Sequence, residues 1–257
     1  MYPAKRIVCL TEETVETLYL MGEGERIVGV SGFVVRPPEA RRKPKVSTFT
    51  DAKIDEILAL KPDLVFTFSD IQADITANLM RAGLEVHAFN HRTIDGIFSM
   101  IRTVGALIGE AEKAAVLSAD LAMRIDAARE KARAFKRRPR VYFEEWDEPM
   151  ISAIGWVSEL IEIAGGENVF ADRAFGQAAK ERFVTSEEVI AAQPDIIIGS
   201  WCGKGFKRNE VAARAGWDQI PAVKNGRLYE IKLSIILQPG PAALTDGLAQ
   251  LQRIIRP

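Results

Sequence analysis

The sequence has few of the residues that commonly bind transition metals, with only two histidines and two cysteines among 257 residues. Protein sites for zinc usually need several imidazole or thiolate ligands, so no resident metal site of that kind is predicted. Cys9 and Cys202 lie too far apart in the sequence to form a metal knuckle or a redox pair by spacing. Cys9 falls in an apolar segment and is predicted to be a buried thiol, and a disulfide with Cys202 is the alternative.

Sequence motifs for phosphate binding and for covalent catalysis are also missing. The chain has no glycine-rich phosphate loop and no dinucleotide-binding fingerprint. The stretch Gly199–Gly203 superficially resembles a nucleophile elbow, but its spacing is wrong and the second half of the chain has no histidine to act as a base. These absences favour a binding protein over an enzyme, and we predict neither a catalytic residue nor a cofactor.

Long apolar runs and a large excess of one charge are lacking as well. No stretch reaches the roughly 18–20 apolar residues of a membrane-spanning helix. The formal net charge of −1 argues against general binding of nucleic acids or of membrane surfaces. Residues 1–6 lead directly into a predicted strand without the apolar run of a secretory signal. A cytoplasmic location and a leader outside this sequence are both left open.

One pattern in the sequence occurs twice. Residues 56–66 (EILALKPDLVF) are matched by residues 188–198 (EVIAAQPDIII), and each copy predicts a helix end, a Pro-Asp turn and a buried strand. A second matched pair, residues 6–12 and 140–145, lies upstream at nearly the same offset. Two matched pairs at one offset predict two similarly built lobes, and ligand sites favour the interfaces between such lobes.

The alternation of predicted strands and helices indicates an α/β fold with parallel sheets, arranged as two Rossmann-like lobes. The lobes are predicted at residues 1–108 and 137–257, with a connecting helix at residues 109–136. The part of that helix from Glu110 to Phe135 contains no glycine or proline. At about 1.5 Å per residue it would span roughly 35–40 Å, which suits a rigid helix that joins two lobes.

Ligands of parallel α/β sheets bind beyond the carboxyl ends of the strands, so the residues at those ends are the candidates for a site. In the first lobe they include Thr11, Glu12, Phe33, Phe68, Ser69, His91 and Arg92, and in the second Glu145, Trp146, Trp201, Cys202 and Ser234. Trp146 and Trp201 follow two predicted strands in corresponding places. Their flat rings would suit a large planar ligand, although a tryptophan in a loop often only covers its own core.

An acidic segment, residues 144–148, follows the first predicted strand of the second lobe. Paired carboxylates can perform acid–base chemistry or bind a hard metal ion. A charged, solvated loop is the simpler interpretation. One carboxylate, that of Glu145, is kept as a candidate ligand contact.

The chain resembles the helical-backbone substrate-binding proteins of ABC importers, and among them the branch that binds vitamin B12 and iron–siderophores. The matching segments are residues 6–13, 46–48, 57–65, 83–86, 162–170 and 187–198. The resemblance implies two lobes joined by one rigid helix, with the ligand in the cleft and a small hinge motion. It also implies that Trp146, Trp201, Phe68 and Phe33 stand where contacts to a corrin ring would come from. Docking on a permease would use one surface acidic residue per lobe, near Asp74 and Glu210.

The leading hypothesis is therefore a non-enzymatic binding protein for a corrinoid or a related metal chelate. The resemblance implies a monomer outside the cytoplasm, in the periplasm or at the cell surface, with an ABC permease as its partner. A ferric siderophore or haem is the alternative ligand, for which Arg36, Arg92, Lys204 and Lys207 could face an anionic chelate. An oxyanion such as molybdate, a cytoplasmic protein that handles metal chelates, and a relic that binds nothing tightly remain open.

Overall fold

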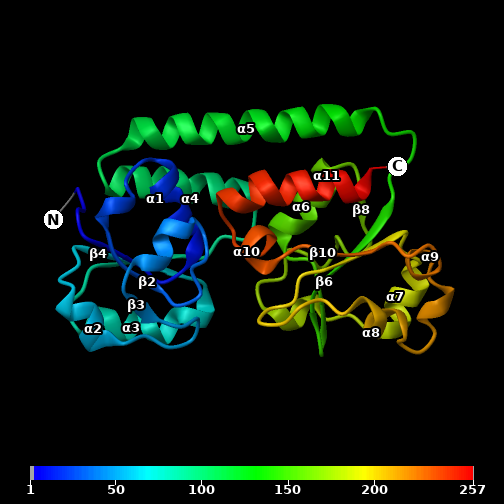
Figure 1. Cartoon of the computed structure of the whole chain (residues 1–257), viewed down its shortest axis with the longest axis horizontal. Coiled ribbons are helices and arrows are strands. Elements are labelled where there is room, and N and C mark those ends of the chain that lie inside the picture. Colours follow the sequence, from blue (N-terminus) through cyan, green and yellow to red (C-terminus); the bar gives the residue numbers. More distant parts are fainter. Residues whose placement is uncertain (1–2, 257) are drawn as a thin grey trace. The chain divides into compact units, whose positions relative to one another are not determined.

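The computed structural model describes residues 3–256 of the chain, and Figure 1 shows its helices and strands. Contacts divide the chain into two compact units. The N-terminal unit contains residues 1–91 and 95–121, and the C-terminal unit contains residues 92–94 and 122–257. The longest helix, α5 (Ala111–Arg133), belongs to both units because the division falls after Leu121. Across residues 3–256, none of the helices has the length and apolarity that crossing a bilayer requires.

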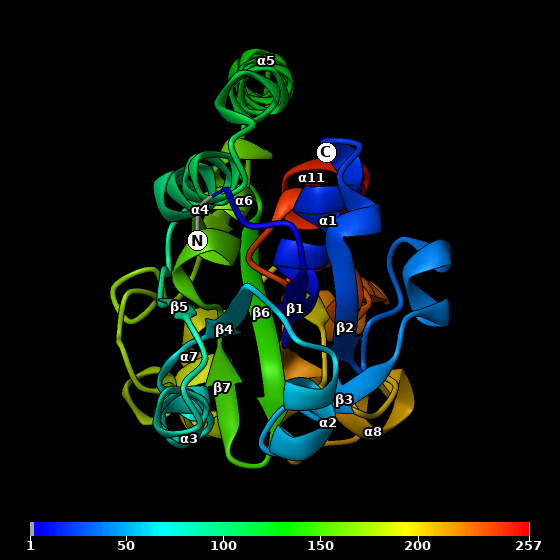
Figure 2. The same cartoon turned by 90° about the vertical axis from the view of Figure 1, so that its left-hand side faces the viewer.

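The N-terminal unit contains a five-stranded sheet in the order β3-β2-β1-β4-β5. Its strands are β1 (Ile7–Cys9), β2 (Ile27–Ser31), β3 (Lys45–Ser47), β4 (Leu64–Phe68) and β5 (Val86–Phe89). Every neighbouring pair is parallel, and β2, β1 and β4 can be followed side by side in Figure 2. All five residues of β4 are buried, as expected for a parallel strand that is covered on both faces.

Helices follow the strands of this unit in alternation, as the sequence predicts. They are α1 (Glu12–Leu20), α2 (Ile54–Ala59), α3 (Ala73–Arg81), most of α4 (Ile94–Leu107), and the short 3₁₀ turns η1 (Gly24–Arg26), η2 (Pro38–Arg42) and η3 (Asp70–Gln72). Residues 31–47 are predicted to be a loop, but they contain η2 and β3. That strand has only three residues and follows a proline-rich stretch, so no periodic pattern marks it in the sequence.

The sheet of the C-terminal unit has the order β10-β9-β6-β7, with β8 paired to β6. Its strands are β6 (Arg140–Asp147), β7 (Met150–Ser152), β8 (Glu167–Asn168), β9 (Ile196–Gly199) and β10 (Leu228–Glu230). All pairs are parallel except β6 with β7, which form an antiparallel hairpin. The predicted strand at residues 141–143 is therefore longer, and most of the acidic segment predicted as a loop lies in β6.

The helices of the unit are α6 (Gly155–Ile163), α7 (Ser186–Ala192), α8 (Arg208–Ala212), α9 (Pro221–Lys224), α10 (Leu233–Ile236) and α11 (Leu248–Ile255), with the 3₁₀ turns η4 (Ala179–Arg182) and η5 (Trp217–Gln219) and the π-helical segment η6 (Ala243–Gly247). Four helices of this unit, α6, α7, α8 and α11, lie close to segments that the sequence predicts as helices, whereas the short helices α9 and α10 are not predicted. Trp156 lies in α6 and not in the loop where it is predicted. Its ring is buried, and its indole N–H donates to the carbonyl of Ile236 at 2.9 Å.

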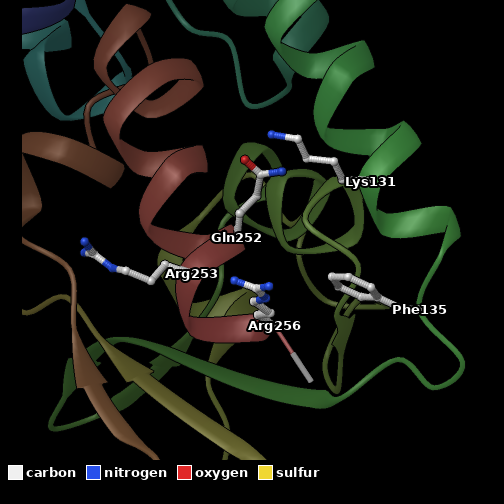
Figure 3. Close-up of a pocket in the computed structure, with 5 residues that line it drawn as sticks. All are labelled: Lys131, Phe135, Gln252, Arg253 and Arg256. Atoms are coloured by element: carbon white, nitrogen blue, oxygen red, sulfur yellow. The ribbon is translucent and has the colours of Figure 1, made fainter.

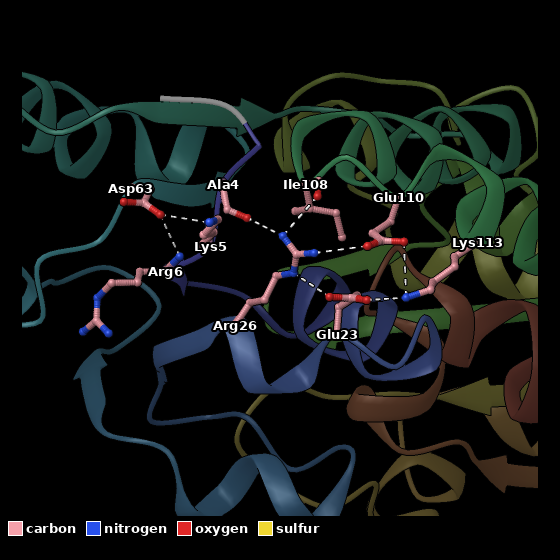
Figure 4. A network of polar contacts seen from close by, with 9 residues as sticks. All are labelled: Ala4, Lys5, Arg6, Glu23, Arg26, Asp63, Ile108, Glu110 and Lys113. Carbon is pink, nitrogen blue, oxygen red and sulfur yellow. Dashed lines mark hydrogen bonds and ion pairs between the residues drawn. The ribbon is translucent and has the colours of Figure 1, made fainter.

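The repeated Pro-Asp pattern forms the same contacts in each unit. In the N-terminal unit, Oδ2 of Asp63 accepts hydrogen bonds from the backbone N–H groups of Lys5 and Arg6 at 2.8 and 2.9 Å (Figure 4). In the C-terminal unit, Oδ2 of Asp195 accepts one from the backbone N–H of Arg140 at 2.8 Å. The N–H of each aspartate donates in return to the carbonyl of the same arginine, at 2.7 and 2.8 Å. We call each of these pairs an Arg–Asp clamp.

The arginine side chain of each clamp reaches back to the helix that precedes the turn. Nε of Arg6 donates to the carbonyl of Leu60 at 3.2 Å, and Nε of Arg140 donates to that of Ala192 at 3.1 Å. The residue before each proline has a positive φ, 48° in one copy and 45° in the other, so each helix ends where proline disfavours helical geometry. The sequence repeat is therefore a repeat of structure.

Candidate ligand-binding residues

The residues predicted after β1 lie at the start of α1 and are buried. Thr11 occupies the N-cap position, but its hydroxyl donates to the Glu13 carboxylate instead of accepting a backbone N–H. Burial raises the pKa of Glu12, and it raises the pKa of Glu13 to about 8 even though the hydrogen bond from Thr11 acts to lower it. Glu13 is thus largely a neutral acid at pH 7, and Thr11 and Glu12 expose little surface to a ligand.

Phe33 follows β2, and its ring is among the most exposed apolar groups of the N-terminal unit. Its exposed fraction is 55%. Its backbone N–H donates to the hydroxyl of Ser31 at 3.3 Å, which holds the turn in which it lies. An exposed aromatic ring on a fixed turn can contact a flat ligand without rearrangement of the core.

The structure brings together two predicted residues at the ends of β4 and β5. The rings of Phe68 and His91 pack edge to face, with their centroids 5.2 Å apart. Ser69 has a φ of 64°, and its hydroxyl accepts the N–H of Ile71 at 3.3 Å, so it turns the chain away from the strand. Sequence reasoning did not find Gln72, which is fully buried and accepts the N–H of Phe68 at 3.0 Å.

Arg92 belongs by its contacts to the C-terminal unit, although it follows His91 directly. Its backbone carbonyl packs against the start of α6. A Cβ atom added at Gly155 would lie 2.2 Å from that oxygen, so only glycine permits the contact. Most of the Arg92 side chain is buried.

In the C-terminal unit, Trp146 and Trp201 share one cation. Nζ of Lys204 lies 4.4 Å from the ring centroid of Trp146 and 5.1 Å from that of Trp201. The carboxylate of Asp147 holds this ammonium at 2.7 and 2.8 Å. Trp146 is half-buried at the end of β6, whereas Trp201 is almost wholly buried after β9. The two predicted tryptophans are therefore brought together, with Lys204 against both rings.

Glu144 anchors the ring of Trp201 from within the core, whereas the indole N–H of Trp146 donates to the carbonyl of Glu148 at 2.8 Å. The Glu144 carboxylate is fully buried and accepts hydrogen bonds from the Tyr142 hydroxyl at 2.9 Å and from the Trp201 indole at 3.1 Å. The guanidinium of Arg214 donates to both carboxylate oxygens at 2.6 and 2.9 Å and lies over the ring of Trp217. Sequence reasoning missed Arg214, because no local pattern links it to a residue seventy positions earlier.

Glu145, on the opposite face of β6, forms an ion pair. Its carboxylate meets the buried guanidinium of Arg182 at 2.5 Å, and Arg182 also donates to the carbonyl of Ser152 at 2.8 Å. Within residues 3–256 no group of three or more His, Cys, Asp or Glu side chains is placed to hold a metal ion. Glu145 thus neutralises a buried cation in this structure.

The remaining predicted residues lie at the surface or near it, with the exception of the buried Cys9. Cys202 is an exposed thiol, and Ser234 lies in α10 after β10. Cys9 is a buried thiol as predicted, and burial raises its pKa to about 12. Asp74 in α3 and Glu210 in α8 are exposed, and Glu210 pairs with Lys207 at 2.8 Å.

Two open pockets lie away from these residues. One, of about 580 Å³, is in the C-terminal unit near the ends of α5 and α11, and Figure 3 shows its lining of Lys131, Phe135, Gln252, Arg253 and Arg256. The other, of about 610 Å³, is in the N-terminal unit beside α1 and η2. Arg36, one of the cations considered for an anionic chelate, lines the second pocket, whereas none of the candidate ligand contacts at the strand ends and neither docking carboxylate lines either pocket.

Relatives and solved structures match nearly the whole chain. The vitamin B12-binding protein of Vibrio parahaemolyticus is 26% identical over 94% of this chain and 86% of its own length. An uncharacterized ABC transporter substrate-binding lipoprotein of Bacillus subtilis is 27% identical over 98% of this chain and 80% of its length. The periplasmic heme-binding protein of Roseiflexus sp. RS-1 superimposes with a TM-score of 0.82 at 27% identity, over 98% of this chain and 100% of that one.

A further structure agrees in fold. The periplasmic vitamin B12 binding protein of Vibrio cholerae has a TM-score of 0.77 and 24% identity over 99% of this chain and 97% of its own. These likenesses confirm the predicted α/β fold with two units and mainly parallel sheets. The model of the family described as periplasmic binding protein matches residues 7–234. The chain therefore belongs to the periplasmic binding protein family.

Proposed function

We propose that the protein is the substrate-binding component of an ABC-type importer and that its cargo is a corrinoid or a related metal chelate. Family membership supports the transport role, and relatives that match over most of this chain carry the names vitamin B12-binding protein and cobalamin-binding protein. The observation that carries the ligand class is the pair of indole rings, Trp146 and Trp201, gathered around Lys204 in one unit.

Aromatic faces suit such a cargo for a physical reason. A macrocyclic chelate has a large, nearly flat surface whose removal from water against aromatic rings is favourable. A few polar groups then fix its orientation, as is usual in small-molecule sites. In the N-terminal unit, the exposed ring of Phe33 offers further aromatic surface, and the ring of His91 packs against the buried Phe68 beside it. The proposed activity is binding of the cargo alone, without a catalytic step.

A haem or a ferric siderophore is the second candidate cargo. The heme-binding protein of Roseiflexus sp. RS-1 matches this chain at 27% identity, which is as high as the identity of the vitamin B12-binding relatives. Lys204, beside the indole rings, could pair with an acidic group on such a chelate. The two cargo classes share a flat or ring-bearing metal chelate, and titration separates them.

The ligand proposal is tested by tryptophan fluorescence. Purified protein is titrated with cobalamin, cobinamide, haem and a ferric siderophore, and saturable quenching by a corrinoid at micromolar or lower concentration is expected. Trp146→Leu should weaken that binding. Phe175→Leu, which alters an exposed aromatic residue outside the predicted site, should leave it unchanged. Saturation by haem alone would move the assignment to the second cargo, and quenching by none of the four ligands would overturn the proposal.

For transport, we propose a location in the periplasm or at the cell surface and docking of a monomer on its permease through Asp74 and Glu210. Both carboxylates are exposed, one on each unit, and could pair with cations of a permease. Asp74→Lys and Glu210→Lys should each impair cargo uptake by a reconstituted importer while cargo binding in solution is kept. Asp218→Lys, at another exposed aspartate, is the control. Uptake at the wild-type rate in both variants would exclude docking through these residues.

A further inference from the structure

Lys204 lies against the two rings on which the proposed function rests. Its ammonium lies within 5.1 Å of the ring centroids of both Trp146 and Trp201. At these distances a cation is attracted to the negative face of an indole ring. Trp201 is almost wholly buried, so a flat ligand would stack on the half-exposed ring of Trp146 and must share or displace Lys204 there.

Asp147 fixes the ammonium in this place. Its two carboxylate oxygens lie 2.7 and 2.8 Å from Nζ of Lys204. An ammonium has three N–H donors, and a carboxylate that approaches with both oxygens engages two of them at most. The Lys204 side chain keeps 40% of its surface exposed, so its remaining donor can be reached from solvent. A ligand oxygen could accept that third hydrogen bond.

The neighbouring charges are already paired with one another. Lys207, three residues further on, pairs with Glu210, and the buried carboxylate of Glu144 pairs with Arg214. Neither Lys207 nor Arg214 forms a described contact with the ring of Trp146. Lys204 is thus the cation that a ligand lying on this ring would meet first.

Resting on the proposed function, we infer that Lys204 is a specificity-determining residue that selects ring-shaped chelates with peripheral carboxylates over those with peripheral amides. A carboxylate accepts a charge-assisted hydrogen bond from the ammonium as the ring slides onto the indole, whereas an amide offers only a neutral acceptor. A chelate with neither group would move the ammonium off the indole faces without compensation.

The experiment compares two corrinoids that differ in their peripheral groups. Dicyanocobinamide carries amides, and dicyanocobyrinic acid carries carboxylates at the corresponding positions. Each is titrated into the wild-type protein, into Lys204→Met and into Lys207→Met, with fluorescence quenching as the measurement. Lys207→Met is the matched control, because it removes a nearby lysine that makes no described contact with either ring.

In the wild-type protein, the carboxylate-bearing corrinoid should bind about tenfold more tightly or better, the usual worth of a hydrogen bond to a charged group. Lys204→Met should abolish this preference, and Lys207→Met should keep it. Equal affinities in the wild-type protein, or a preference that survives in Lys204→Met, would overturn the inference while the proposed function stands. A protein that binds neither corrinoid in any form would overturn the inference together with the corrinoid assignment of the proposed function.

The position of Lys204 has a test that needs no ligand. Removal of an ammonium that covers the Trp146 ring should make the tryptophan fluorescence of Lys204→Met more accessible to quenching by acrylamide than that of Lys207→Met. Identical quenching in the two variants would show that Lys204 does not cover the ring, and the inference would fail on that ground alone.

Discussion

Arg214 donates to both carboxylate oxygens of Glu144, at 2.6 and 2.9 Å, and thereby neutralises a charge that is completely removed from water. Replacement of Arg214 by Met would leave that carboxylate buried without a counter-ion. We expect a loss of about 3–5 kcal/mol in the free energy of unfolding, measured by urea denaturation. Lys207→Met, which breaks an exposed and solvent-screened ion pair with Glu210, should leave the free energy of unfolding nearly unchanged.

The double variant Glu144→Leu/Arg214→Met separates charge from packing. Removal of both charges should restore much of the stability that Arg214→Met loses, because no buried charge is then left unpaired. If Arg214→Met were as mild as the Lys207 control, the Glu144 carboxylate would not depend on this guanidinium.

Glu13 should make stability depend on pH in the direction opposite to that of most carboxylates. Burial raises its pKa from 4.5 to about 8 in the folded protein, so the folded state keeps a proton that the unfolded state has lost between these values. Stability should therefore be fully present below about pH 4.5 and should fall as the pH rises towards 8. At most the fall is about 1.4 kcal/mol per pH unit for one group.

Glu13→Gln should remove this part of the pH dependence, since a glutamine side chain carries no charge at either pH. The measurement is the unfolding midpoint of the variant and of the wild-type protein at pH 5, 6, 7 and 8, set beside the exposed control Glu25→Gln. A difference between Glu13→Gln and wild type that stays constant over this range would contradict the raised pKa. Glu12, whose pKa burial also raises, adds to the dependence in the same direction in both proteins.

Glu145 should behave as the partner of a buried cation and not as a metal ligand. Glu145→Gln would leave the guanidinium of Arg182, whose side chain is 4% exposed, without its counter-ion. We expect a loss of about 3 kcal/mol in the free energy of unfolding. The divalent metal content, measured by elemental analysis of purified protein, should not change. Loss of a stoichiometric metal ion in the variant would contradict this role.

The two Arg–Asp clamps should contribute to stability by similar amounts. Asp63→Asn and Asp195→Asn each replace a charged acceptor of backbone N–H groups by a neutral one, and each should cost about 1–3 kcal/mol. Hydrogen exchange should quicken at the start of β1 in the first variant and at the start of β6 in the second. The exposed Asp218→Asn is the control. A variant that loosens neither strand would show that the clamp of its unit is dispensable.

Acid should weaken the Asp63 clamp in particular. Hydrogen bonds from the backbone N–H groups of Lys5 and Arg6, of which that from Lys5 contributes most, hold the pKa of Asp63 below its usual value of 3.8, and partial burial acts in the opposite sense. The stabilisation is thus present above about pH 4 and is lost as the pH falls through the lowered pKa. Between pH 5 and 2, wild type should approach the stability of Asp63→Asn.

Much of the fold could be predicted from the sequence because its elements are periodic and locally bounded. Strands β4 and β9 and helix α7 lie at the predicted residues, since each is an apolar or capped segment beside a Pro-Asp turn. The extension of β6 and its hairpin with β7 could not be predicted, because acidic residues usually mark loops. What allows Glu144 in a buried strand is Arg214, and that pairing exists only in three dimensions.

Some residues of the candidate site could be predicted from the sequence for a similar reason. Strand ends are predictable, so Trp146 and Trp201 could be named, and the structure brings them together around one lysine. The orientation of each ring depends on the indole acceptors, Glu148 for Trp146 and Glu144 for Trp201, which no periodicity reveals. Lys204 was considered only as a general cation, because its contact with both rings is a property of the folded loop.

The Arg–Asp clamps lie at the amino ends of β1 and β6, whereas the side chains that we assign to cargo lie at or beyond the carboxyl ends of β2, β4, β6 and β9. Each sheet therefore has its stabilising clamp at one end of its strands and its proposed ligand contacts at the other end. Substitutions among the proposed cargo contacts should thus leave the contacts of the clamps in place. Relatives that keep the clamps and differ in the residues around Lys204 would then share this fold and differ in the ligand that they bind.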